Sequence, residues 1–302
     1  MGGGYLWVAF TLVAATAQVL RNSAQAGLTR RIGTLGATQV RFVFGFPFAL
    51  VFLLGAVAAT GEATPAINLE AMGWILLGAT SQILGTALML VAMNARGFGI
   101  AYAYIKTEPV IVALLGVLLL GDLPTALGWV AIVVVTFGVI LAATPPGQFG
   151  RLLEDLRPAG IGIMSGAFFG LSAIAFRGSI EALASGSFLM RSMLMLAISL
   201  GVQTLLLGLW LALCDRAAFA GSLREWRASI GAGFLGALAS AGWFLSFSLT
   251  SAANVRTLGL IEMPLAALLS KRVTGKALAT HEWVGFALVT GGVALLLLGH
   301  RA

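Results

Sequence analysis

Charged residues are scarce in this chain of 302 residues: they make up 10% of it, against 59% for hydrophobic residues. Soluble domains carry roughly a quarter charged residues, so this chain has too few charges to cover a surface in water. The mean hydropathy of +1.00 agrees. The composition excludes a soluble protein and predicts that the lipid bilayer covers most of the surface.

Cysteine and histidine are nearly absent. The single cysteine, Cys214, excludes an internal disulfide. The two histidines, His281 and His300, lie at the ends of apolar runs and have no second histidine, aspartate or cysteine grouped with them in the sequence. We therefore predict no metal site, no catalytic residues and no cofactor.

Long polar segments are also missing, whereas long apolar runs fill the chain. A helix needs about 20 apolar residues to cross the hydrocarbon of a bilayer. Ten such spans can be drawn, at residues 5–28, 34–59, 71–93, 98–120, 125–143, 158–183, 187–213, 228–250, 254–270 and 281–299. The first lacks the basic segment that precedes the apolar core of a signal peptide, so we expect a retained helix. The sequence predicts an all-α polytopic membrane protein with ten transmembrane helices.

The basic residues are distributed unevenly between the loops. A net charge of +7 could suggest nucleic acid, but short basic loops on the cytoplasmic side explain it, and we expect no nucleic-acid partner. Eleven basic residues follow odd-numbered spans: Arg30, Arg31, Arg96, Arg151, Arg157, Arg216, Arg224, Arg227, Lys271, Arg272 and Lys276. The opposite side has only Arg301. This bias predicts a multi-pass protein of the bacterial inner membrane with both termini in the periplasm.

The chain contains an internal repeat. Residues 108–141 align without a gap on residues 262–295, 154 positions later, with twelve of 34 positions identical, including Glu108/Glu262 and Trp129/Trp283. We therefore predict a first five-helix repeat at 1–143, a connecting loop at 144–157 and a second five-helix repeat at 158–302. Because five is odd, the two copies would enter the membrane from opposite sides. Such inverted repeats are typical of secondary transporters.

Several motifs together resemble a known family. They are the ten-helix duplication, the arginines that begin spans two and seven, the prolines near the two glutamates, and the Gly-Asp pair before the span with Trp and Gly: Arg41, Arg191, Pro109, Pro264, Gly121, Asp122, Trp129 and Gly138. The chain resembles the EamA-type branch of the drug/metabolite transporter superfamily over its whole length. The resemblance implies export of amino acids, other metabolites or toxic cations, through a cavity lined by spans 1, 3, 4, 6, 8 and 9.

Eight charged residues lie inside the predicted spans: Arg21, Arg41, Lys106, Glu108, Arg177, Arg191, Arg256 and Glu262. A charge at the bilayer centre costs at least about 2.5–3.5 kcal/mol, so it is retained for a partner or a pathway. Glu108 and Glu262 are the leading candidates, because a nearby proline frees a backbone carbonyl around Tyr104 and Leu260. Each could carry a proton or bind a substrate amine. The alternative is a structural ion pair with an arginine of span one, two, six or seven.

The remaining candidates would line the same cavity. Arg21 and Arg177 could bind a carboxylate or phosphate, or pair with the two glutamates. Lys106 lies two residues from Glu108 and should face elsewhere on its helix, where it could reach the cavity together with Tyr102. The aromatic side chains of Tyr104, one turn before Glu108, and Trp243 would suit an amino acid or an organic cation.

We therefore predict a secondary transporter that moves a small-molecule substrate by alternating access. In one version of this hypothesis, the protein also carries protons. Two other classes stay open: a membrane-embedded enzyme, and a lipid scramblase, channel or structural subunit. The short loops disfavour the enzyme because they leave no lid over an active site. The sequence leaves the substrate, the coupling ion and the oligomeric state open.

Overall fold

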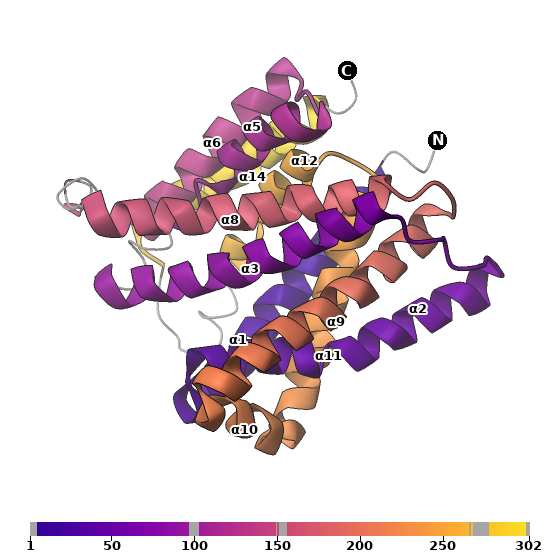
Figure 1. The fold of residues 1–302 in the computed structure, drawn as a ribbon. Coiled ribbons are helices and arrows are strands. Elements are labelled where there is room, and N and C mark those ends of the chain that lie inside the picture. Colours follow the sequence, from indigo (N-terminus) through magenta and orange to yellow (C-terminus); the bar gives the residue numbers. More distant parts are fainter. Residues whose placement is uncertain are drawn as a thin grey trace. The chain divides into compact units, whose positions relative to one another are not determined.

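The computed structural model describes residues 5–96, 103–148, 150, 156–265, 267 and 278–299. These residues form helices and connecting segments, with no strand in the described ranges. The helices are α1 (Leu6–Val43), α2 (Phe46–Thr60), α3 (Leu69–Arg96), α5 (Glu108–Leu120), α6 (Ala126–Ala143), α8 (Leu156–Glu181), α9 (Phe188–Cys214), α10 (Arg216–Arg224), α11 (Trp226–Phe247), α12 (Ala252–Gly259) and α14 (Thr280–Gly299) (Figure 1). The all-α fold class is thereby confirmed.

Eight helical stretches within the described residues are long and apolar enough to cross a membrane. They run over Arg31–Thr60, Leu69–Ala92, Ala103–Leu120, Ala126–Ala143, Arg157–Glu181, Phe188–Cys214, Trp226–Phe247 and Thr280–Gly299. Eight of the ten predicted spans therefore have a counterpart. The predicted spans 5–28 and 254–270 are not among these eight, so the count of ten stays a prediction.

The helices in these two regions also differ from the prediction in their local geometry. The predicted loop after the first span is absent: α1 continues as a helix to Val43 and is interrupted only at Gly33, where φ is +72°. Such a φ is easily adopted only by glycine. In the predicted span 254–270, α12 ends at Gly259 and a turn at 260–261 follows before the chain becomes helical again at 262–265. The helix α10 was not predicted.

The outer side chains of the helices are apolar. Leu54, Leu118, Leu205, Leu209 and Leu213 each expose between 63% and 78% of their surface. In lipid, helices satisfy their own backbone hydrogen bonds and can present such side chains outward. Together with the eight candidate spans, this surface makes the chain a multi-pass membrane protein.

The chain divides into two compact units. Unit 1 comprises Met1–Ile83 and Ala175–Thr250, and unit 2 comprises Leu84–Ile174 and Ser251–Ala302. Each unit thus combines segments from both predicted repeats, and α3 and α8 contribute residues to both units. The division into compact units is therefore a different one from the predicted division into repeats.

In unit 1, α1 and α11 pack side by side along much of their length (Figure 1). The hydroxyl group of Thr11 donates to that of Ser246, 2.9 Å away, and Ser246 donates to the carbonyl oxygen of Trp7. A Cβ atom added to Gly242 would lie 2.7 Å from the carbonyl oxygen of Phe10. A small residue here is what permits the backbones to approach so closely.

The segments that connect the helices of unit 1 contact one another in two pairs. Arg31, next to the Gly33 kink, forms an exposed ion pair of 3.2 Å with Glu225, between α10 and α11. At the other pair, the side chain of Asn68 donates to the carbonyl oxygen of Ala182, and the Ser187 backbone N–H donates to Glu62. The 27 residues of α9 separate the second pair from the first by about 40 Å, at 1.5 Å per residue. The two pairs therefore lie at opposite ends of unit 1.

In unit 2, α6 and α14 form the most extensive helix pair, and the contact runs through glycines. A Cβ atom added to Gly285 would lie 2.5 Å from the carbonyl oxygen of Gly138. Further along, Gly292 meets Val135 and Gly299 meets Leu127. Residue numbers rise along one helix as they fall along the other, so the two helices pack antiparallel.

We predict that Gly285→Ala destabilises the protein, because the added methyl group would press on a backbone oxygen that cannot rotate away. Overpacking of this kind costs about 1–3 kcal/mol. Gly291, on the same helix, has nothing within 4 Å of its added Cβ, so Gly291→Ala is the matched control. Thermal unfolding of the purified variants in detergent measures the effect. Equal midpoints for both variants would contradict the packing described here.

Candidate functional site

Two helix breaks stand at equivalent positions of the repeat. Residues 106–107 form a turn between the helical segment 103–105 and α5, and residues 260–261 form a turn between α12 and the segment 262–265. The two turns are 154 residues apart, as in the sequence alignment. Pro109 and Pro264 follow them closely, and proline lacks the N–H that would continue the helical ladder. The breaks predicted from the prolines are therefore present.

Other donors satisfy the backbone oxygens around the breaks. The carbonyl oxygen of Tyr104 accepts hydrogen bonds from the backbone N–H and the hydroxyl group of Thr107, at 3.3 and 2.8 Å. The carbonyl oxygen of Leu260 accepts one from the backbone N–H of Met263 at 3.1 Å. Each break is thus held as a tight turn, which sets the direction in which the next helical segment leaves.

Each repeat-related glutamate is the first residue of the helical segment after a break. Glu108 begins α5, and Glu262 begins the segment 262–265. The amino end of a helix carries a partial positive charge and unpaired N–H groups, which favour a carboxylate at this position. Each of the two glutamates therefore lies at the amino end of a helical segment.

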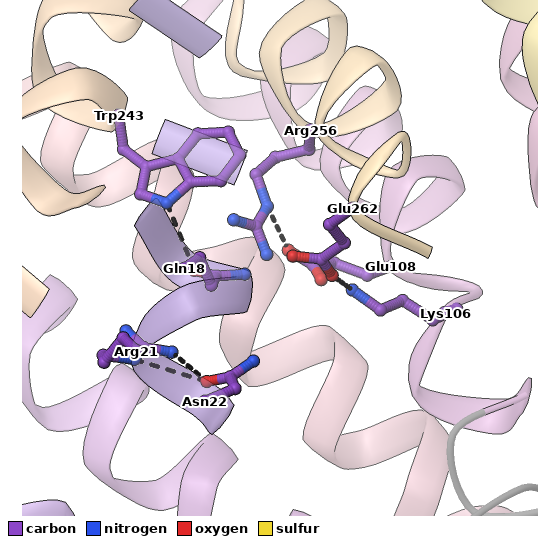
Figure 2. A network of polar contacts seen from close by, with 8 residues as sticks. All are labelled: Gln18, Arg21, Asn22, Lys106, Glu108, Trp243, Arg256 and Glu262. Atoms are coloured by element: carbon purple, nitrogen blue, oxygen red, sulfur yellow. Dashed lines mark hydrogen bonds and ion pairs between the residues drawn. The ribbon is translucent and has the colours of Figure 1, made fainter. Parts of the chain in front are cut away.

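Both carboxylates are buried and form crossed ion pairs within unit 2. Lys106 Nζ lies 2.5 Å from Glu262 Oε1, and Arg256 Nε lies 2.6 Å from Glu108 Oε1. Each pair joins one residue from the first break to one from the second, and Figure 2 shows both cations pointing to the carboxylates. Only 2% of Glu108, 6% of Glu262 and 6% of Lys106 are exposed. Pairing of this kind offsets the cost of removing the charges from water.

The partners differ from those that the sequence suggested. The expected alternative was an arginine of span one, two, six or seven, whereas Lys106 and Arg256 belong to spans four and nine. Lys106 donates to Glu262 of the other break. Arg256 was noted as an intramembrane charge but was not selected as a site residue. Its place within an apolar run, six residues before Glu262, was the available signal.

Of the two aromatic candidates of span four, one packs against α8 and the other lies outside the described residues. The turn at 106–107 interrupts the helix between Tyr104 and Glu108, which the one-turn spacing took to be continuous. Tyr104 is buried and packs against Ala159 and Gly162 of α8. Tyr102 lies outside the described residues.

Arg177 bonds to three residues of unit 1. Its guanidinium Nη1 donates to the carbonyl oxygens of Phe247 and Thr250, at 2.6 and 2.7 Å, and Nη2 lies 2.7 Å from Glu181. Phe247 is the last residue of α11, where backbone oxygens have no partner in the helix. Arg177 therefore ties α8 to the end of α11, and its acidic partner here is Glu181.

The two other candidates lie on the α1–α11 contact of unit 1. Arg21 is 7% exposed, and its Nε and Nη2 donate to the side-chain oxygen of Asn22 at 3.3 and 2.7 Å. Trp243 of α11 donates from Nε1 to the side-chain oxygen of Gln18 at 3.3 Å (Figure 2). Gln18 precedes Arg21 by one turn on the same face of α1.

We predict that Lys106→Met lowers the free energy of unfolding by about 3–5 kcal/mol, because it leaves the Glu262 carboxylate buried without its ammonium partner. The double variant Lys106→Met/Glu262→Met should recover much of this loss. As a control, Arg31→Met removes an exposed pair and should cost less than about 1 kcal/mol. Unfolding in detergent measures all three. A double variant no more stable than the single one would refute the pairing.

The comparisons with known proteins agree with this architecture. Residues 4–144 match the model of the EamA-like transporter family. Twenty-eight chains of solved structures also match. One of them, titled "Crystal structure of protein", is 16% identical in sequence and has a TM-score of 0.72. The match covers 100% of this chain and 98% of that chain, so the two share a fold. No curated protein matches. As the sequence motifs indicate, residues 4–144 are similar to the EamA-like transporter family, which belongs to the drug/metabolite transporter superfamily.

Proposed function

We propose that this protein is a secondary transporter that exports a small organic solute from the cytoplasm across the bacterial inner membrane by alternating access. The observation that carries the proposal is the pair of helix breaks with crossed ion pairs, Lys106–Glu262 and Arg256–Glu108. Discontinuous helices with charged groups at the break are typical of the substrate and ion sites of such transporters. The candidate solutes are amino acids, other metabolites and organic cations.

The connections of unit 1 support two copies of opposite orientation. In the predicted duplication, the connection near Gly33 corresponds to the one after α8, since each joins the first two spans of its repeat. The first of these meets Glu225, through Arg31, whereas the second meets Glu62 and Asn68 at the opposite end of α9. Corresponding connections at opposite ends are what an inverted repeat requires.

The α6–α14 contact of unit 2 supports the same arrangement. These two helices correspond to one another in the repeat, and they pack antiparallel. Val135 and Val289, which are equivalent positions, lie near the middle of the contact, and both are completely buried. Two equivalent helices that cross antiparallel at equivalent residues are related by a local two-fold axis, as in inverted transporters.

The ion pairs would serve as the part of the mechanism that responds to the solute or to protons. A buried pair holds together while both charges are present, and it loses its attraction when the carboxylate takes up a proton. Because each pair joins the two breaks, protonation of one glutamate would loosen one break from the other. In this way Glu108 or Glu262 could couple proton movement to the rearrangement of the two halves.

We expect solute flux into proteoliposomes that saturates with concentration, and Glu108→Gln or Glu262→Gln should abolish flux driven by a pH gradient while solute exchange continues. Glutamine keeps the size of the side chain but cannot take up a proton. Glu70, an exposed acid in the first turn of α3, provides the matched control Glu70→Gln. Competition among amino acids, quaternary cations and sugar phosphates would identify the solute class.

Three results of this experiment would decide against parts of the proposal. Unchanged pH dependence in both glutamine variants would remove the coupling role of the two glutamates. Flux that does not saturate would favour a channel, and lipid movement without solute flux would favour a scramblase. The saturation curve and the pH dependence therefore test the transport function and its coupling separately.

The orientation follows from the eleven basic residues of the loops after odd-numbered spans, which predict both termini in the periplasm. We expect an alkaline-phosphatase fusion at Ala302 to be active, because this enzyme folds only after export. A fusion in the connecting loop 144–157 is the internal control and should be silent. The reverse pattern would invert the orientation and, with it, the sidedness of every loop.

A further inference from the structure

We infer that the end of unit 1 formed by α10 binds the headgroups of anionic phospholipids. Three exposed arginines carry the binding, and we call them the arginine surface: Arg216, Arg224 and Arg227. A lipid site of this kind goes beyond the proposed transport function and does not depend on it, since it concerns the lipids around the protein rather than the solute.

The helix α10 is too short to cross the membrane. Its nine residues extend about 13 Å at 1.5 Å per residue, whereas the hydrocarbon core is about 30 Å thick. Single residues, Asp215 and Glu225, separate α10 from the membrane helices α9 and α11 (Figure 1). The helix therefore lies where α9 leaves the bilayer and α11 enters it, at the level of the headgroups.

Small residues attach α10 to the rest of unit 1. Ala218 and Ser222 are buried, and a Cβ atom added to Gly36 of α1 would lie 3.2 Å from the carbonyl oxygen of Ala218. Arg216 and Arg224 lie outside this contact and are exposed. A helix with one face packed and a basic face exposed is typical of the membrane interface.

The acids at this end of unit 1 do not cancel the charge of the arginines. Asp215 accepts a hydrogen bond from the backbone N–H of Ala218 at 3.0 Å, and Glu225 pairs with Arg31 of α1 at 3.2 Å. Residues 214–227 together with Arg31 contain four arginines and two acids. An excess of positive charge at the headgroup level attracts anionic lipids.

Apolar side chains beside the arginine surface are suited to acyl chains. Exposed side chains recur every fourth residue along the last part of α9 and the first part of α11: Leu205, Leu209, Leu213, Trp226, Ile230 and Phe234. Residues four apart share a helix face, so each helix has an apolar stripe that ends at α10. Tryptophan is enriched at the membrane interface, and the Trp226 ring centre lies 5.2 Å from Cζ of Arg227.

Arg216 is held at the end of the α9 stripe. Its Nε donates to the carbonyl oxygen of Ala212 at 3.3 Å, one residue before Leu213. This bond uses one of the five N–H donors of the guanidinium group, and arginine forks bind phosphate well. A phospholipid with its phosphate at the arginine surface and its acyl chains along a stripe fits this arrangement.

The test measures the unfolding temperature of the purified full-length protein in detergent, with dioleoylphosphatidylglycerol or zwitterionic dioleoylphosphatidylcholine added. A lipid that binds only the folded state raises this temperature. We expect phosphatidylglycerol to raise it by at least about 3 °C more than phosphatidylcholine does. Equal shifts with the two lipids would overturn the inference in favour of an acidic protein partner.

Variants of the arginine surface locate the effect. The triple variant Arg216→Gln/Arg224→Gln/Arg227→Gln should lose most of the shift specific to phosphatidylglycerol, because it removes the attracting charges. Lysine at the same three positions keeps the charges and should retain most of the shift. The full shift in the glutamine variant, or its loss in the lysine variant, would overturn the inference.

A variant of Glu225 tests the surface with every arginine in place. Glu225→Gln removes a negative charge beside Arg224 and should enlarge the shift specific to phosphatidylglycerol, whereas Glu70→Gln, at an exposed acid in the first turn of α3, should not change it. This comparison remains informative if the triple variants fail to fold. Equal shifts in the two glutamine variants would count against the site.

Inorganic phosphate separates a lipid from a free anion. At equal ionic strength and without lipid, phosphate should not reproduce the shift caused by phosphatidylglycerol, because it has no acyl chains to lie along the apolar stripes. An equal shift with phosphate alone would overturn the assignment to a lipid.

Discussion

The structure of unit 2 depends on one constraint: a charge removed from water needs a partner of opposite charge close by. Lys106, Glu108, Arg256 and Glu262 meet this constraint as two pairs, each at hydrogen-bond distance. Because the partners of each pair come from segments about 150 residues apart, the pairs join the two breaks to each other. Loss of any one side chain would leave a buried charge behind, which is far more costly than the pair itself.

The same demand for partners explains the polar groups of unit 1. A helix end leaves backbone oxygens without partners, and Arg177 supplies two hydrogen bonds to the end of α11. Ser246 and Thr11 link α1 to α11 in the same way. In a bilayer, where apolar contact alone does little to hold helices together, such hydrogen bonds and close glycine contacts carry much of the association.

Helix breaks, close contacts and charges thus combine into a structure with several features of a carrier. Glycines allow α6 and α14 to touch along their backbones, and prolines interrupt the helices beside Glu108 and Glu262. In our proposal, the charged breaks respond to protons or solute.

Much of the fold and part of the site follow from local sequence. Apolar runs of about 20 residues predict membrane helices because lipid tolerates few other structures, and eight of the ten predicted spans have counterparts. The prolines predict the breaks because proline cannot donate to the helical ladder. The kink at Gly33 was missed, since a glycine is compatible with a loop as well as with a bent helix. The spacing rule for Tyr104 and Glu108 assumes an unbroken helix, whereas a turn at 106–107 lies between them.

The sequence by itself determined that the chain is helical and embedded in lipid, where its helices break, and which charged residues require an explanation. These properties depend on composition and on neighbours a few residues away. Only the tertiary structure decided that Lys106 pairs with Glu262 and Arg256 with Glu108, that Arg177 serves α11, and that each compact unit draws on both halves of the chain. The reason is physical: long basic side chains can reach several acids, and packing between distant segments selects the partner.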